Sequence, residues 1–142
     1  MADLDTTQFL GTGWSFPPTF LRDPAQVRMT SDDLNIRQCL WVLFSTTIGE
    51  RIMLATYGSG LGLRVFDALT TTMSNTISSN IEKAILDWEP RIDVTNIEIK
   101  EMAPLNGGLT ISIDYIVRQT NSRSNLVYPF YLTEATLALP PV

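Results

Sequence analysis

The sequence has no histidine and a single cysteine among its 142 residues. Without histidine the chain cannot build a Ser-His-Asp or Cys-His catalytic system, and most zinc sites lose their usual ligand. The lone Cys39 excludes an internal disulfide and a thiolate zinc cluster, and its place in an apolar pattern predicts a small buried hydrophobic residue. We therefore expect no catalytic residues, no cofactor and no metal.

Basic runs and long apolar runs are also missing. The chain has 10 Lys and Arg against 15 Asp and Glu, a net charge of −5, which argues against a nucleic-acid or anionic-membrane partner. No apolar run approaches the roughly 20 residues of a membrane-spanning helix, and the acidic start MADLDTTQFL does not resemble a signal peptide. We expect synthesis and assembly in the cytoplasm, with no nucleic acid bound and no membrane insertion.

The length and composition predict one folded domain with an extended lead. Hydrophobic residues make up 44% of the chain and charged residues 18%, and a domain of this size buries about 68–70% of its unfolded surface. We expect a single α+β domain over residues 30–142, preceded by an extended N-terminal segment over residues 1–29. Prolines exclude a regular helix in that segment, but its aromatic residues are too apolar for a free tail. The segment either wraps its own domain or inserts into a neighbouring subunit.

Two helices are expected. Ile36, Cys39, Leu40 and Leu43 form an apolar stripe in a helix from Thr30 to about Thr46. A second stripe begins at Ile77 and ends at Trp88, where Glu89-Pro90-Arg91 must leave the helix because proline lacks an N–H and disfavours helical backbone before it. The preceding polar residues, Thr70–Asn75, are expected to form a loop or a frayed turn, after a short apolar patch at residues 63–69.

Three strand-like runs follow the second helix. The run from Ile92 to Ile99 alternates with a slip at Asn96, which indicates a bulge. A hairpin signal at residues 106–108 leads into a strictly alternating strand over residues 109–117, and a polar turn at residues 121–125 leads into a third strand over residues 126–132. Pro129 marks that third strand as an edge strand or a bulge. The fold class is α+β: two main helices packed on a small antiparallel meander of about three strands.

Chemical motifs are weak. The glycines at 58, 60 and 62 do not match a phosphate-binding loop. Glu50 and Glu89 adjoin turns beside apolar residues and could in principle form the carboxylate pair of a glycosidase. Both acids have arginine close by in sequence, as structural ion pairs usually do.

Four segments carry a resemblance to a known family. FLGTGWSFPP, GERIMLATYGSGL, WEPRI and NLVYPFYL, in this order, make the chain similar to the baseplate wedge family of contractile tails, historically labelled lysozyme-like. The resemblance implies a structural component of a contractile phage tail, a type VI secretion apparatus or an extracellular injection particle. The resemblance implies that the chain links the baseplate core to the sheath, and we expect it to nucleate sheath assembly.

The resemblance also suggests binding residues and partners. It assigns wedge contacts to Glu89, Pro90 and Arg91, and we add Trp14 and Phe16 of the aromatic lead as partner-binding candidates. The expected partners are other baseplate wedge subunits, the sheath protein, and the central spike, hub or inner tube base, with multiple copies in a sixfold baseplate. An open sheet edge would accept a strand from the sheath. The candidates for sheath contact lie in the first and third strands: Ile92, Val94, Ile97, Ile99, Val127 and Tyr131. The remaining alternative is a small peptidoglycan-cleaving glycosidase.

Overall fold

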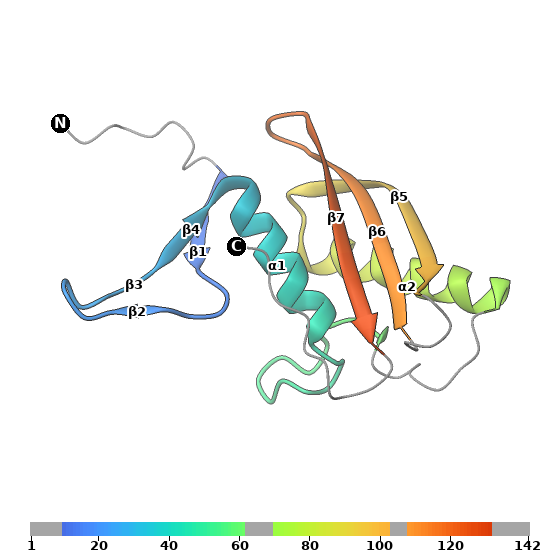
Figure 1. Cartoon of the computed structure of the whole chain (residues 1–142), viewed down its shortest axis with the longest axis horizontal. Helices are drawn as coiled ribbons and strands as arrows, with labels where there is room; N and C mark the ends of the chain where they lie inside the picture. Colours follow the sequence, from blue (N-terminus) through green and yellow to red (C-terminus); the bar gives the residue numbers. More distant parts are fainter. Residues whose placement is uncertain (1–9, 62–69, 103–107, 132–142) are drawn as a thin grey trace.

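The computed structural model describes residues 10–61, 70–102 and 108–131. An antiparallel sheet runs in the order β5 (Ile92–Glu101), β6 (Gly108–Val117) and β7 (Ser122–Tyr131). Two helices, α1 (Asp32–Ser45) and α2 (Thr71–Trp88), lie against this sheet (Figure 1). Buried side chains of both helices and the sheet form one core. The predicted α+β fold is confirmed.

Helix α2 follows its apolar stripe and begins earlier than expected. Ile77, Ile81 and Ile85 are buried, as the spacing predicts. The side chain of Thr70 accepts a hydrogen bond from the Met73 backbone N–H at 3.2 Å, which caps the helix. Because Met73 lies four residues before Ile77 and is also buried, it adds a turn to the apolar face. The expectation of a loop or frayed turn at Thr70–Asn75 is therefore wrong.

Helix α1 packs on the sheet through aromatic side chains. Its residues Trp41 and Phe44 meet the ring of Tyr128 in β7 edge-on, with centroids 4.7 and 5.5 Å apart. The predicted stripe of Ile36, Leu40 and Leu43 is buried. Cys39 departs from that prediction, since it is only half-buried and lies at the margin of the packed face.

The sheet keeps one face on the core. Ile97 in β5 pairs with Ile113 in β6, which pairs with Leu126 in β7, so these residues form a row under the helices. The register shifts between Val94 and Asn96, which confirms the predicted irregularity. Strand β7 is an edge strand of the described sheet, as Pro129 suggested.

The second predicted turn is too long. Strand β7 begins at Ser122, because polar residues that looked like a turn form the outer face of the hairpin. There the Asn125 side chain donates hydrogen bonds to Ser112 at 3.0 Å and to Asp114 at 2.6 Å. The hairpin residues 106 and 107 and the apolar patch at residues 63–69 lie outside the described residues.

The N-terminal segment contains a two-part hairpin that the sequence did not predict. Strand β1 (Thr12–Trp14) pairs with β4 (Met29–Ser31), and β2 (Phe20–Leu21) pairs with β3 (Gln26–Val27). We call residues 12–31 the arm. Figure 1 shows the arm extending from the start of α1 away from the sheet.

The glycine-rich loop after α1 closes back on that helix. The Ser59 N–H donates to the Thr46 carbonyl at 3.0 Å, and the Ser59 hydroxyl donates to the Phe44 carbonyl at 3.1 Å. Gly58 has φ +126°, and a Cβ there would lie 2.6 Å from the Thr46 oxygen. Glycine is thus required by the close approach of two backbones. Neither described helix is long and apolar enough to span a membrane.

Candidate functional site

The site lies where α2 turns into β5. The Glu89 N–H still donates to the Ile85 carbonyl at 2.8 Å, so it completes the last helical turn. Pro90 then takes the chain out of the helix, and the Arg91 carbonyl accepts from the Arg118 N–H at 3.0 Å, at the end of the sheet. The two side chains on either side of Pro90 are consequently fixed by a helix on one side and a sheet on the other.

Glu89 and Arg91 form a two-bond ion pair. Arg91 Nε donates to Glu89 Oε1 at 2.6 Å, and Arg91 Nη2 donates to Glu89 Oε2 at 2.7 Å. The Glu89 side chain is 5% exposed and that of Arg91 24%. The hydrogen bond to Glu89 is the main cause that raises the pKa of Arg91 above its ordinary value, against a lowering by burial. Both oxygens of Glu89 are therefore used inside the protein.

Arg91 also binds two other segments. Its Nη1 donates to the carbonyl of Leu10 at 2.9 Å and to the side-chain oxygen of Asn35 at 2.9 Å. One guanidinium thus connects the end of α2, the first turn of α1 and the chain just before the arm. The predicted wedge-contact residues are first of all an internal junction.

The junction extends through two polar residues of α1. Asn35 donates to the Thr30 hydroxyl at 3.4 Å, and that hydroxyl donates to Gln38 Oε1 at 3.0 Å. Gln38 Oε1 also accepts from the Phe16 N–H at 3.2 Å. Asn35 and Gln38 are buried, and the sequence analysis missed them. Their signal was present: two amides three residues apart stand among the apolar residues of this helix, and a buried amide needs partners.

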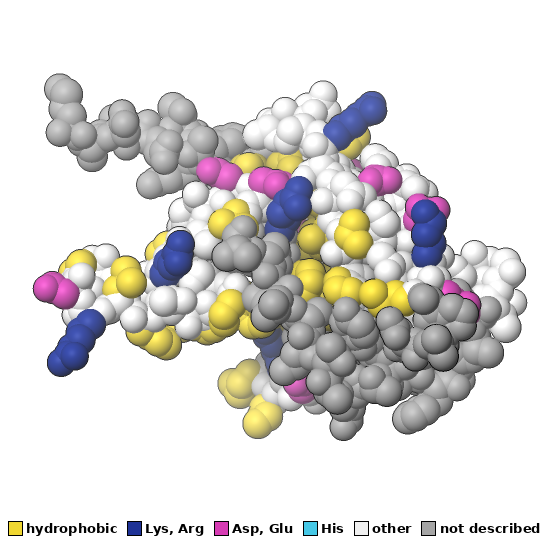
Figure 2. All heavy atoms as spheres, in the orientation of Figure 1, with side chains coloured by type: hydrophobic (Ala, Val, Ile, Leu, Met, Phe, Trp, Pro, Cys, Tyr) yellow, Lys and Arg dark blue, Asp and Glu magenta, His cyan; other side chains and the backbone are white. Residues whose placement is uncertain are grey.

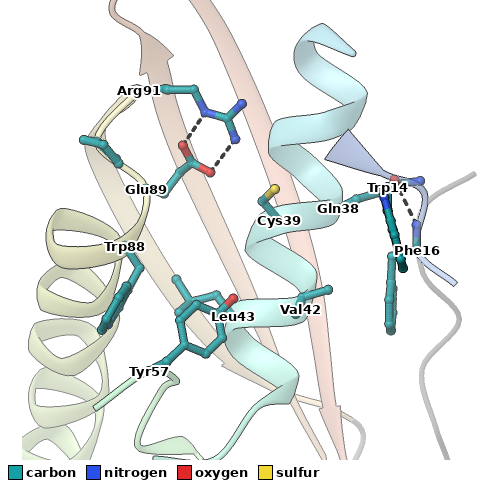
Figure 3. A pocket seen from close by; sticks show the side chains of 11 residues that line it. Trp14, Phe16, Gln38, Cys39, Val42, Leu43, Tyr57, Trp88, Glu89 and Arg91 are labelled. Carbon is teal, nitrogen blue, oxygen red and sulfur yellow. Dashed lines mark hydrogen bonds and ion pairs between the residues drawn. The ribbon is translucent and has the colours of Figure 1, made fainter. Parts of the chain in front are cut away.

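An open groove of about 440 Å³ lies beside the junction (Figure 3). In Figure 3 the α1 residues Gln38, Cys39 and Val42 lie in the middle, with the arm's aromatic rings on one side and the end of α2 on the other. Its lining is mainly apolar and aromatic: Trp14, Phe16, Gln38, Cys39, Val42, Leu43, Tyr57, Trp88, Glu89, Pro90 and Arg91. The groove therefore brings together all five predicted partner-binding residues.

Aromatic contacts hold one wall of the groove. The rings of Tyr57 and Trp88 meet at a centroid distance of 5.2 Å, and the guanidinium of Arg51 lies 4.1 Å above the Tyr57 ring. Burial raises the pKa of the Cys39 thiol, and the charge of Glu89 raises it further. A half-buried neutral thiol between aromatic rings is a packing surface for apolar groups.

The described residues of the groove favour binding over catalysis. Glu89 is the one of the two suggested glycosidase acids that lines it, whereas Glu50 is exposed in the loop after α1 and accepts from the Thr47 N–H at 2.9 Å. Within the described residues, no three His, Cys, Asp or Glu side chains gather in a way that could hold a metal.

The sheath-contact candidates lie apart from the groove, in the sheet. Ile92 is buried, and Val94, Ile97 and Ile99 are half-buried against the core, so these side chains face the helices. Val127 is 51% exposed on the opposite face. Tyr131 is the last residue of β7. Among the described strands β5 pairs only with β6. Its outer edge therefore presents mainly backbone N–H and C=O groups to a partner.

Comparisons with known proteins give one family match and several similar solved structures. Residues 30–122 match the family described as Baseplate wedge protein gp25. A protein named as a tail lysozyme of Geobacter sulfurreducens has a similar structure, with 37% identity, a TM-score of 0.68, and coverage of 75% of this chain and 96% of that chain. None of the curated protein sequences matches the chain.

Two further solved structures are similar. A chain of the anti-feeding prophage baseplate has 27% identity and a TM-score of 0.65, and 91% of each chain is covered. A chain of the type VI secretion baseplate complex has 13% identity and a TM-score of 0.56, covering 66% of this chain and 88% of that one, which supports the fold alone.

Proposed function

Because the chain belongs to the baseplate wedge protein gp25 family, we propose that it is a structural wedge that joins the core of a contractile baseplate to the sheath and nucleates sheath assembly. The family match over residues 30–122 is the observation that carries this proposal. The similar chain in the anti-feeding prophage baseplate supports it, because that structure is a sixfold assembly of a contractile particle. Part of the chain's surface must then serve as subunit interface.

The groove is the proposed docking site for a neighbouring baseplate subunit. Its aromatic walls supply area with few rotatable bonds, which is typical of residues that dominate protein interfaces. The Glu89 and Arg91 side chains are held by four hydrogen bonds of 2.6 to 2.9 Å, so little conformational freedom remains to be lost on binding. In this proposal the ion pair shapes the groove and the apolar lining binds the partner.

The sheet is the proposed connection to the sheath. Strand β5 is ten residues long and has one unpaired side among the described strands, which is a template for an added strand. The side chains of Ile97 and Ile99 pack inward, so a sheath strand would be held mainly by main-chain hydrogen bonds at this edge. Other partners in the proposal are the central spike, hub or inner tube base, and the chain would be present in several copies around a sixfold ring.

A second candidate function is cleavage of peptidoglycan. Its support is the 37% identical structure that is named as a tail lysozyme. Against it, both oxygens of Glu89 accept hydrogen bonds from Arg91, and Glu50 is outside the groove. The baseplate wedge family is structural, so we place the wedge role first.

The test is removal of the chain from cells that produce its contractile particle. We expect electron micrographs to show no full-length sheath on baseplates, and re-expression of the chain to restore it. An immunogold label on the restored chain should lie at the junction between sheath and baseplate. Normal sheathed particles without the chain would contradict the proposal.

A further inference from the structure

The arm has one apolar face that points away from the domain. Trp14 pairs across the strands with Met29, and Phe20 pairs with Val27, so each pair shares a side of the hairpin. The rings of Trp14 and Phe20 meet at 6.2 Å, which places both pairs on the same side. Trp14, Phe20 and Met29 are 61%, 70% and 51% exposed. We call these four residues the arm face, and Figure 2 shows hydrophobic side chains along the protruding arm.

The opposite side of the arm is anchored, so the arm face cannot turn inward. A Cβ at Gly13 would lie 2.6 Å from the Asn35 amide nitrogen, which shows how closely the arm approaches α1. Thr30, which pairs with Gly13, is buried and bonded to Gln38. Residues 13 and 30 face α1, because Gly13 approaches Asn35 closely and Thr30 is buried. Since side chains alternate along a strand, residues 14 and 29 point outward.

The arm face is continuous with the groove, and the arm that carries it differs in net charge from the rest of the chain. Trp14 belongs to both, because it lines the groove as well as contacting Phe20. The ionisable residues of the arm are Arg22, Asp23 and Arg28, a net charge of +1 in a chain of −5. An apolar strip on an arm with a net positive charge fits an apolar segment flanked by acidic residues.

We infer that the arm face binds an apolar, acid-flanked segment of the same baseplate subunit that occupies the groove. This inference rests on the proposed function and names the partner's chemistry. Four side chains are too few for a stable interface between two copies, which needs about 800 Å² from each partner, but they extend an existing one effectively. The family match begins at Thr30, so nearly all of the arm precedes it, whereas most residues of the groove lie within it. In this inference the arm adds selectivity for the partner to the binding by the groove.

The experiment uses the full-length chain in cells that assemble its particle. A photo-crosslinking phenylalanine analogue is placed at Phe20 on the arm face, at Val42 in the groove, or at Leu21, which points to the other side of the hairpin. Purified particles are irradiated, and the crosslinked peptides are identified by mass spectrometry. Positions 20 and 42 should crosslink to the same partner chain. The partner peptide crosslinked from position 20 should contain apolar residues with Asp or Glu next to them. Position 21 should yield about tenfold less crosslink.

The outcomes separate the inference from the proposed function. Loss of crosslinking at position 42 alone removes the groove as a docking site. The arm inference is overturned if position 20 crosslinks to a second copy of this chain or to a subunit other than the one reached from position 42. It is also overturned if position 20 crosslinks no more often than position 21. In each case the groove proposal stands.

A matched pair of variants provides the second measurement. Phe20→Ser should lower incorporation of the chain into baseplates about tenfold, as truncation of an interface anchor does. Leu21→Ser should incorporate normally. Both should melt close to the unmodified chain, because neither side chain is in the core; they are 70% and 45% exposed. Equal incorporation of the two variants would overturn the inference.

Discussion

Arg91 donates two hydrogen bonds to the carboxylate of Glu89, from which a single proline separates it in the sequence. The side chain of Glu89 is 95% hidden from solvent. The same guanidinium reaches Leu10 and Asn35. The Glu-Pro-Arg step therefore builds the wall of the groove and ties the arm to the domain. Its role in folding and its proposed role in docking are carried by the same bonds.

Arg91→Ala should destabilise the monomer strongly. It leaves the Glu89 carboxylate buried without its partner, a change that costs about 3–5 kcal/mol. Arg91→Lys should be intermediate, because an ammonium cannot reproduce the two-bond fork. Urea denaturation of the purified variants measures both effects.

An exposed ion pair provides the control. Arg118 donates to Asp93 at 2.8 Å, but both side chains are about half exposed, so Arg118→Ala should change stability by no more than about 1 kcal/mol. Equal stability losses for Arg91→Ala and Arg118→Ala would show that the buried junction is not energetically special. A stable Arg91→Ala protein that fails to enter baseplates would instead assign the residue to docking.

Gly13→Ala should loosen the arm. The added Cβ would lie 2.6 Å from the Asn35 amide, which is itself held by Arg91, so the arm must shift or the junction must break. A loss of about 1–3 kcal/mol is expected for such overpacking. Gly60→Ala is the comparison, because its Cβ would lie 3.3 Å from the half-buried Asn80 side chain, which has room to move. A smaller loss for Gly13→Ala than for Gly60→Ala would contradict the close approach.

Cys39 should react slowly with iodoacetamide at pH 8. Burial raises the pKa of its thiol, so the reactive thiolate is scarcer than in the unfolded chain, and the groove walls hinder access. Denaturation in urea should accelerate the modification several-fold, and higher pH should accelerate it in the folded protein. In assembled particles the groove proposal expects protection of Cys39. Identical rates for the free chain and the particle would count against occupation of the groove.

The purified protein should not cleave peptidoglycan. Glu89 is committed to Arg91, and Glu50 lies in an exposed loop. Turbidity of a peptidoglycan suspension should remain constant with the wild-type chain. Turnover that disappears in a folded Glu50→Gln or Glu89→Gln variant would establish the glycosidase alternative.

Proline substitutions test the sheet edge. Thr95→Pro, Ile97→Pro and Val127→Pro each remove one main-chain donor, and variants that keep the wild-type melting temperature have lost no essential internal bond. Among these, at least one should fail to assemble full-length sheath if a sheath strand pairs with β5 or β7. Thr95→Pro also removes a side-chain hydrogen bond, because the Thr95 hydroxyl donates to the Asp114 carbonyl at 3.0 Å beside the bulge. Full sheath assembly by every folded variant would exclude strand addition at these positions.

Local patterns in the sequence determined the elements of this protein. The apolar stripe ending at Trp88, the proline at 90, and the alternation from Leu109 to Val117 each encode a helix, a stop or a strand through nearest-neighbour geometry, and the structure follows them. The bulge near Asn96 could be read for the same reason, because a slip in a two-residue period has one local explanation. The four motifs also identified the family.

Tertiary structure alone decided which residues meet. Arg91 and Asn35 are 56 positions apart, and nothing in either segment indicates that one would satisfy the other. The arm was missed because its strands are only two or three residues long and are stabilised by cross-strand pairing and by Gln38, which no local pattern records. The half-burial of Cys39 has the same origin: helical periodicity gives the direction of a side chain, but whether that side is covered depends on where the arm and the end of α2 come to lie.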